Sequence, residues 1–245
     1  MRGDGETAGS VRDRFYANWS LVILVLILAS FPMTYFIPVT TGAKQFTPLV
    51  HVHGAIFFAW AALFAWQSHL VATGKVARHR EIGMAGIAIS AMMLPMGIFT
   101  AAGAIAGRMK QGNATPYDFA FFNLIDIALF SLLMVAAIAT VTRHREWHRR
   151  FIFGAALSLL SPAFSRWTLQ LPFVAPWPDL ITYGFDALLI VLALHDRRVI
   201  GKVHPATWWT ATALVPLHVA SPFIAYGEWW RSVAPAIFDP LLLGA

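Results

Sequence analysis

Cysteine is absent from the 245-residue sequence. This absence excludes disulfide bonds, thiolate metal sites, iron–sulfur clusters and cysteine nucleophiles. Charged residues are also scarce, at 12% of the chain, while hydrophobic residues make up 58% and the mean hydropathy is +0.63. A typical soluble domain has about 25% charged residues. The composition therefore predicts a membrane protein in which any metal is held by His, Asp or Glu.

Two further function classes are excluded by where the cations lie. The net charge is +6 and the pI is near 10.1, but the cations fall between apolar runs and form no basic stripe, so we expect no nucleic-acid partner. Lysine is missing from every long apolar run, because all four lysines lie in the expected loops. A retinal Schiff base, which needs a lysine inside the bundle, is therefore excluded.

Seven apolar runs are each long enough, at about 20 residues, to cross a bilayer as a helix. We predict an all-α fold, a polytopic bundle of seven transmembrane helices over residues 19–227, with tails at 1–18 and 228–245. The second tail begins Glu228-Trp229-Trp230-Arg231, which is typical of the membrane interface. A signal peptide cleaved near Thr41-Gly42-Ala43 is the alternative for the first run. The runs lie near 19–36, 48–72, 82–106, 118–142, 150–170, 178–195 and 205–227.

The distribution of lysine and arginine predicts how the bundle is oriented. The first tail and the loops after spans two, four and six hold thirteen of the eighteen cations, and the other side holds five. Cations that flank spans are retained on the cytoplasmic side. The N-terminus is therefore predicted in the cytoplasm and the C-terminus outside.

Three ionisable residues fall at one expected depth in the outer half of the bundle. At 1.5 Å per residue, Asp126, Asp186 and His218 lie roughly 12–14 Å below the outer boundary, and His51 and His53 are shallower at roughly 5–8 Å. A charge that faces lipid at such depth costs a few kcal/mol, so these side chains should point into the bundle and toward one another. Each of the deep three has a polar neighbour three positions away on the same helix face. These neighbours are Asn123, Tyr183 and Ser221.

Metal binding is one interpretation of this outer cluster. His51, His53, Asp126, Asp186 and His218 offer donors that suit zinc or iron, although no short motif such as HExxH is present. The protein would then be a hydrolase or oxidoreductase that acts on a lipid or lipophilic substrate. A metal-bound water would be the reactive group, with Asp126 or Asp186 as general base. The alternative is a non-catalytic scaffold in which Arg166 pairs with one aspartate and fixes helix register.

Axial ligation of b-type haem is a second chemistry for imidazoles on facing helices. His204 and His218 are fourteen residues apart and lie within about 40° of one helix face, roughly 21 Å apart along the axis. Their partners on span two would be His51 or His53 at one end and His69 at the other. Haem does not, however, account for Asp126 and Asp186, so an electron-transfer protein is the alternative reading.

The cytoplasmic ends of spans three, five and seven each begin with a histidine: His79, His148 and His204. Helix N-termini disfavour imidazolium and favour anions. These histidines are therefore expected to be neutral caps beside Arg80, Arg149 and Arg150, which together could hold the phosphate of a membrane lipid. Positive-inside flanking alone also explains the arginines, and three converging imidazoles would alternatively make a zinc site.

Several motifs resemble a family of bacterial multi-pass inner-membrane proteins that is catalogued as a domain of unknown function. The motifs are HVHG at 51–54, HR followed by a glycine at 79–83, WHRRF at 147–151 and GKVHPAT at 201–207. The likeness covers about two thirds of the chain, from span two to span seven. It implies a bacterial inner membrane and a shared fold, and it transfers no activity.

Overall fold

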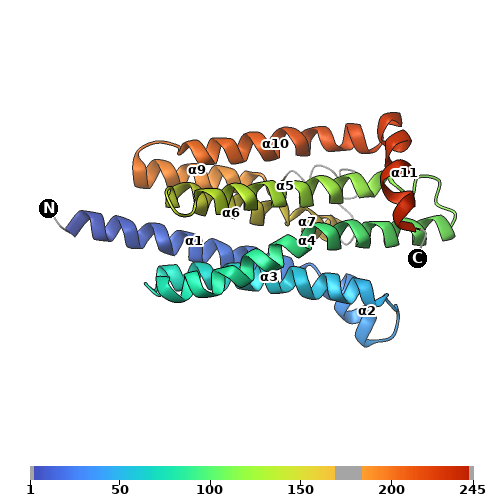
Figure 1. Ribbon diagram of the computed structural model, residues 1–245, viewed down its shortest axis with the longest axis horizontal. Helices are drawn as coiled ribbons and strands as arrows, with labels where there is room; N and C mark the ends of the chain where they lie inside the picture. Colours follow the sequence, from blue (N-terminus) through green and yellow to red (C-terminus); the bar gives the residue numbers. More distant parts are fainter. Residues whose placement is uncertain (1–2, 169–183, 243–245) are drawn as a thin grey trace.

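The computed structural model describes residues 3–168 and 184–242, and every regular element in these ranges is a helix. The helices form one elongated bundle whose long members run side by side (Figure 1). In chain order they are α1 (Gly3–Ala29), η1 (Pro32–Phe36), α2 (Ile37–Thr40), α3 (Pro48–Ala72), α4 (Val76–Lys110), α5 (Asp118–Thr140), α6 (Arg145–Ser158), α7 (Ser161–Thr168), α9 (Ala187–Ile200), α10 (Pro205–Ala225) and α11 (Glu228–Leu242).

Four helical segments are long and apolar enough to cross a membrane: Asp13–Thr40, Pro48–Ala72, Val76–Lys110 and Asp118–Thr140. An all-helical fold with such segments is typical of an integral membrane protein. The run at 205–227 forms α10, a continuous helix of 21 residues that is less apolar than these four segments. The run at 150–170 is divided between α6 and α7, and the start of the run at 178–195 lies outside the described residues. The count of seven spans therefore stays a prediction.

Local sequence explains where the helices begin and end. Pro48 occupies the first turn of α3, where its missing N–H costs nothing, and Gly74 has a φ of +75° in the turn after α3. These two signals place α3 at the predicted 48–72. Pro162 lies in the first turn of α7, so the chain restarts a helix there instead of continuing α6.

The two ends of the bundle differ in character (Figure 1). The end that we name the basic end holds the start of α1, the turn at 73–75 and the loops at 141–144 and 201–204. The opposite end, named the far end, holds α2, the loop at 111–117 and α11. The described cations of the basic end include Lys75, Arg143, Arg145, Arg197, Arg198 and Lys202.

The core is centred on α5, which packs against α4, α6 and α10. Phe130 and Ala137 of α5 are fully buried there. Gly154 of α6 is the tightest point, because a Cβ at this position would lie 2.3 Å from Cγ2 of Thr210 on α10. A glycine is therefore required for α6 to approach α10 this closely.

The C-terminal segment is a helix across the far end. α11 buries Trp230, Ala234 and Phe238, which are spaced four residues apart and so share one face. Trp230 Nε1 donates to the Tyr117 carbonyl oxygen at 3.0 Å. Arg231 Nη2 lies 2.7 Å from Asp118 Oδ2, at the start of α5. The segment that the sequence describes as interfacial is thus packed on the ends of α4 and α5.

Candidate functional site

A buried histidine lies between a buried aspartate and a partly buried one in the half of the bundle nearer the far end. His218 of α10 is 2% exposed, Asp126 of α5 is 4% exposed, and Asp186 directly precedes α9. These are the three residues to which the sequence assigns one depth, and the structure brings them together. We name them the His218 trio.

The two imidazole nitrogens of His218 face different carboxylates. Nδ1 is 3.0 Å from both oxygens of Asp186, so the Nδ1–H donates to that carboxylate. Nε2 is 3.4 Å from Asp126 Oδ1, which is an ion-pair distance without hydrogen-bond alignment. The ring of Phe185 packs edge-on against the imidazole at 5.2 Å and restrains its position. The histidine thus bridges α5 to the start of α9.

The two carboxylates have different surroundings. Asp186 is the N-cap residue of α9, where the helix dipole stabilises a negative charge. Asp126 lies inside α5, next to the buried hydroxyl of Ser161. An ionised Asp186 keeps the ring proton on Nδ1 and leaves the Nε2 lone pair directed at Asp126. Asp126 is therefore the carboxyl group that is placed to share a proton with the ring.

The other predicted members of the outer cluster lie apart from the trio. His51 Nδ1 is 2.5 Å from the Tyr35 hydroxyl on the exposed surface, and His53 packs on Phe57 at 4.1 Å between ring centroids. Arg166 donates to the Pro162 carbonyl oxygen and lies over the Phe31 ring at 4.1 Å. In the described part of the chain Arg166 has no carboxylate partner. The prediction that it pairs with Asp126 or Asp186 is not what this part of the structure shows.

The polar neighbours also point elsewhere. Asn123 borders Gly97 and Phe238 on the α4 side of α5. Ser221 Oγ donates to the Leu217 carbonyl oxygen at 2.6 Å, within its own helix. Tyr183 lies outside the described residues. The three-residue spacing predicted that Asn123 and Ser221 share a helix face with Asp126 and His218, but neither side chain contacts the trio.

At the basic end, the predicted histidines divide into two groups. His79 and His148 line one cavity together with Arg80, whereas His204 lies at the start of α10 and His69 is on the exposed surface of α3. His204 is an N-cap as predicted, since its Nδ1 accepts from the Ala206 N–H at 3.1 Å. The N-caps of α4 and α6 are instead Lys75 and His144. The cap prediction is thus wrong for His79 and His148.

Burial lowers the pKa of His204, and the nearby Arg150 lowers it further. A neutral imidazole retains the lone pair that a cap acceptor needs. The burial and charge around His204 therefore support the capping role that its geometry shows.

Arg150 forms a buried ion pair that the sequence analysis missed. Its side chain is 1% exposed, its Nε donates to Asp196 Oδ1 at 3.0 Å, and its Nη1 donates to Glu146 Oε2 at 2.7 Å. Asp196 also accepts from Thr207 Oγ1 at 2.5 Å and from the His204 N–H at 3.0 Å. Arg150 therefore ties α6 to α9 and α10, and the expectation that it faces lipid phosphate is wrong. In the sequence, a buried arginine at the end of a span looks the same as an arginine that flanks the span on the cytoplasmic side. No sequence signal therefore distinguished Arg150 from Arg149.

Within the described residues, no group of three or more His, Asp or Glu side chains is arranged to hold a metal ion. In the trio, the two nitrogens of one imidazole point to opposite carboxylates, so the three donors do not converge on one point. A haem iron would likewise have to displace a carboxylate to reach His218. The metal and haem predictions stay predictions.

Comparison with protein-family models, with curated proteins and with solved structures finds no match. The class of protein is therefore defined by the fold and the site alone. It is an all-helical chain with four helices suited to crossing a membrane and a buried carboxylate–imidazole–carboxylate arrangement.

Proposed function

We propose that this chain is a multi-pass protein of the bacterial inner membrane whose His218 trio is an acid–base centre. The observation that carries the proposal is one buried imidazole between the buried carboxyl group of Asp126 and the partly buried one of Asp186. No lysine or arginine of the described residues pairs with either Asp126 or Asp186. The predicted orientation places the trio in the periplasmic half.

Charge supports this proposal. With a neutral imidazole and two ionised carboxylates the trio carries a charge of −2, and two added protons make it neutral. Uncompensated charge is costly in a poorly solvated interior. Retaining such a group is explained when the protons themselves are used, because intramembrane ionisable residues mark proton relays and substrate pathways.

The geometry provides a balanced proton transfer. A protonated Asp126 gives its proton to His218 Nε2, and the imidazolium then releases the Nδ1 proton to Asp186. One proton enters and one leaves, so the ring changes tautomer and the charge moves from one carboxylate to the other. After this transfer the ionised Asp126 removes a proton from a molecule that reaches it, and in reverse the same centre delivers a proton through Asp126. The apolar surroundings favour a lipophilic substrate.

Zinc or iron at the trio is the second candidate, carried by the donor chemistry of His and Asp. It requires His218 to turn one nitrogen away from its present carboxylate, whereas the acid–base centre uses the ring as it stands. Lipid or another lipophilic molecule is the substrate class in both cases.

Infrared spectroscopy of the purified protein tests the proposal. We expect a protonated-carboxyl band that is lost in Asp126→Asn. The matched control is Asp118→Asn, on the same helix, whose carboxylate is already paired with Arg231. That control should keep the band.

Two outcomes would overturn the acid–base centre. The first is the absence of any carboxyl band that depends on Asp126 or Asp186. The second is a stoichiometric metal in protein purified without an affinity-tag metal, lost in His218→Gln, or a Soret absorption band, lost in the same variant. The second outcome would replace the proposal with metal or haem binding.

A further inference from the structure

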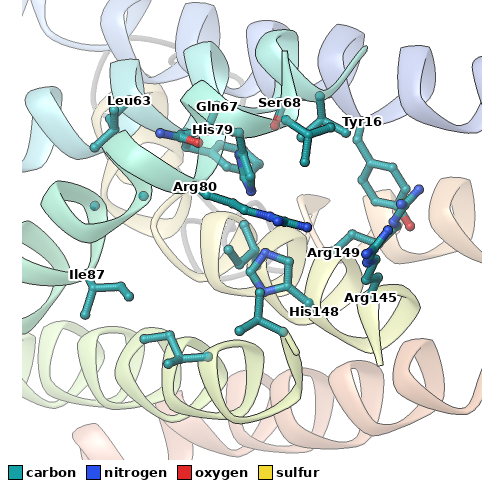
Figure 2. Close-up of a pocket in the computed structure, with 18 of the residues that line it drawn as sticks. Tyr16, Leu63, Gln67, Ser68, His79, Arg80, Ile87, Arg145, His148 and Arg149 are labelled. Atoms are coloured by element: carbon teal, nitrogen blue, oxygen red, sulfur yellow. The ribbon is translucent and has the colours of Figure 1, made fainter. Parts of the chain in front are cut away.

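A cavity of about 580 Å³ lies near the basic end, between α1, α3, α4, α5 and α6. Figure 2 shows Arg80 extending between His79 and His148, with Tyr16, Arg145 and Arg149 on one side. The volume is within the range of small-molecule sites, which is about 300–1,000 Å³. The cavity does not include any member of the His218 trio, so it is a separate site.

Much of the wall is apolar. Trp60 and Phe64 of α3 stack at 5.5 Å and form one side, and Met134 of α5 lines the cavity as well. Met84 of α4 lines the cavity and is 68% exposed, so the cavity is open on this face of the helix. In a membrane, a lipid chain can enter at such a face without crossing water.

Some residues of the lining carry buried polar atoms that have no partner among the described residues. The Tyr16 hydroxyl, both amide atoms of Gln67 and Nδ1 of His79 have no hydrogen bond, and Tyr16 is only 7% exposed. A buried polar group without a hydrogen bond is costly to the fold. His148 Nδ1 donates to the Ala137 carbonyl oxygen at 2.9 Å, which leaves its Nε2 for the cavity. A ligand that carries a polar group can pair with this nitrogen.

The charge of the lining is positive. Three arginines face one aspartate, Asp13, and that aspartate is already paired with Arg149 at 2.8 Å. Arg80 and Arg145 have no carboxylate partner among the described residues. Guanidinium groups bind phosphate and carboxylate oxygens through paired N–H donors. The unpaired cations therefore select an oxyanion.

We infer that the cavity binds a membrane lipid with an anionic head group. The oxyanion lies at Arg80 and Arg145, His148 Nε2 faces the head group, and one acyl chain lies along Trp60, Phe64 and Met134. This site is independent of the acid–base centre, and it gives the chain a defined place for lipid on the side that the sequence predicts to be cytoplasmic.

Native mass spectrometry of the detergent-purified protein measures this binding. The probes are phosphatidylglycerol, phosphatidylcholine with the same chains, and inorganic phosphate. We expect phosphatidylglycerol to bind at least about tenfold more tightly than phosphatidylcholine, and Arg80→Ala or Arg145→Ala to remove about that factor. The matched control is Arg78→Ala, two residues away on α4, whose guanidinium lies over Trp66 at 5.7 Å outside the cavity.

The variant Gly83→Leu tests the role of the cavity volume separately from the role of the arginine charges. Gly83 lines the cavity, and a Cβ there meets no atom within 4 Å, so the helix accepts the change and the leucine occupies the binding space. It should weaken both phospholipids. Equal loss in Arg78→Ala and Arg80→Ala would overturn the inference in favour of general attraction to the basic end. Displacement of phosphatidylglycerol by millimolar phosphate, with no effect of Gly83→Leu, would overturn it in favour of a free-oxyanion site.

Discussion

The Arg150–Asp196 pair and the His218 trio are both buried ionic groups, yet they are built on opposite principles. In the first group a permanent cation, Arg150, binds both Asp196 and the partly exposed Glu146, and hydrogen bonds from Thr207 and the His204 N–H complete the shell of Asp196. The trio places two carboxylates around one imidazole. The first arrangement is complete without further partners, whereas the second is complete only with added protons. The difference identifies the pair as structural and the trio as the candidate for chemistry.

The largest expected effect is on the pair. Arg150→Met leaves Asp196 buried without its cation, and removing one partner of a buried pair costs about 3–5 kcal/mol. The double variant Arg150→Met with Asp196→Asn should recover most of this loss, because the amide oxygen still accepts from Thr207. Thermal unfolding in detergent measures both. Equal stability of the single variant and the wild type would remove the distinction between the two groups.

The second-largest effect is expected from acid, which should weaken the Arg150–Asp196 pair. Burial raises the pKa of Asp196, but hydrogen bonds from Arg150, Thr207 and the His204 N–H outweigh burial and hold it below its usual value. A carboxylate with a depressed pKa contributes stability above its unfolded pKa of about 4, and that contribution is lost as the pH falls through the lower folded value. Unfolding measured from about pH 6 to pH 3 should therefore show a steeper loss in the wild type than in Asp196→Asn. Parallel curves would contradict this role of Asp196.

The smallest effect on stability is expected at the trio. Asp126→Asn replaces a protonated, neutral carboxyl group with a neutral amide of the same size, so the free energy of unfolding should change by less than about 1 kcal/mol. The same thermal unfolding measurement checks this. A loss as large as that of Arg150→Met would make the trio a second structural pair, whatever its infrared spectrum shows.

The depth argument succeeded for the trio because a helix advances a fixed distance per residue. Asp126, Asp186 and His218 could thus be placed at one level before any contact was known. The depth of a residue does not specify the side of the helix on which it lies. The prediction therefore could not show that His51, His53 and Asn123 lie apart from His218. Proline and glycine marked the bounds of α3, whereas the division between α6 and α7 did not follow from hydropathy.

Other features had no pattern to reveal them. Arg150 is adjacent to Arg149 in sequence, yet it is buried in a pair while Arg149 lines the cavity. The lipid cavity depends on how far α3, α4 and α6 stand apart, which is a property of three helices together.

The close approach of Gly154 to Thr210 has an evolutionary consequence. Two methyl-sized groups cannot fit between α6 and α10 at this point. Any homologue with alanine or a larger residue at position 154 must shrink the residue at position 210 or move the helices apart. The two columns of a future alignment should therefore vary in opposite directions in side-chain volume.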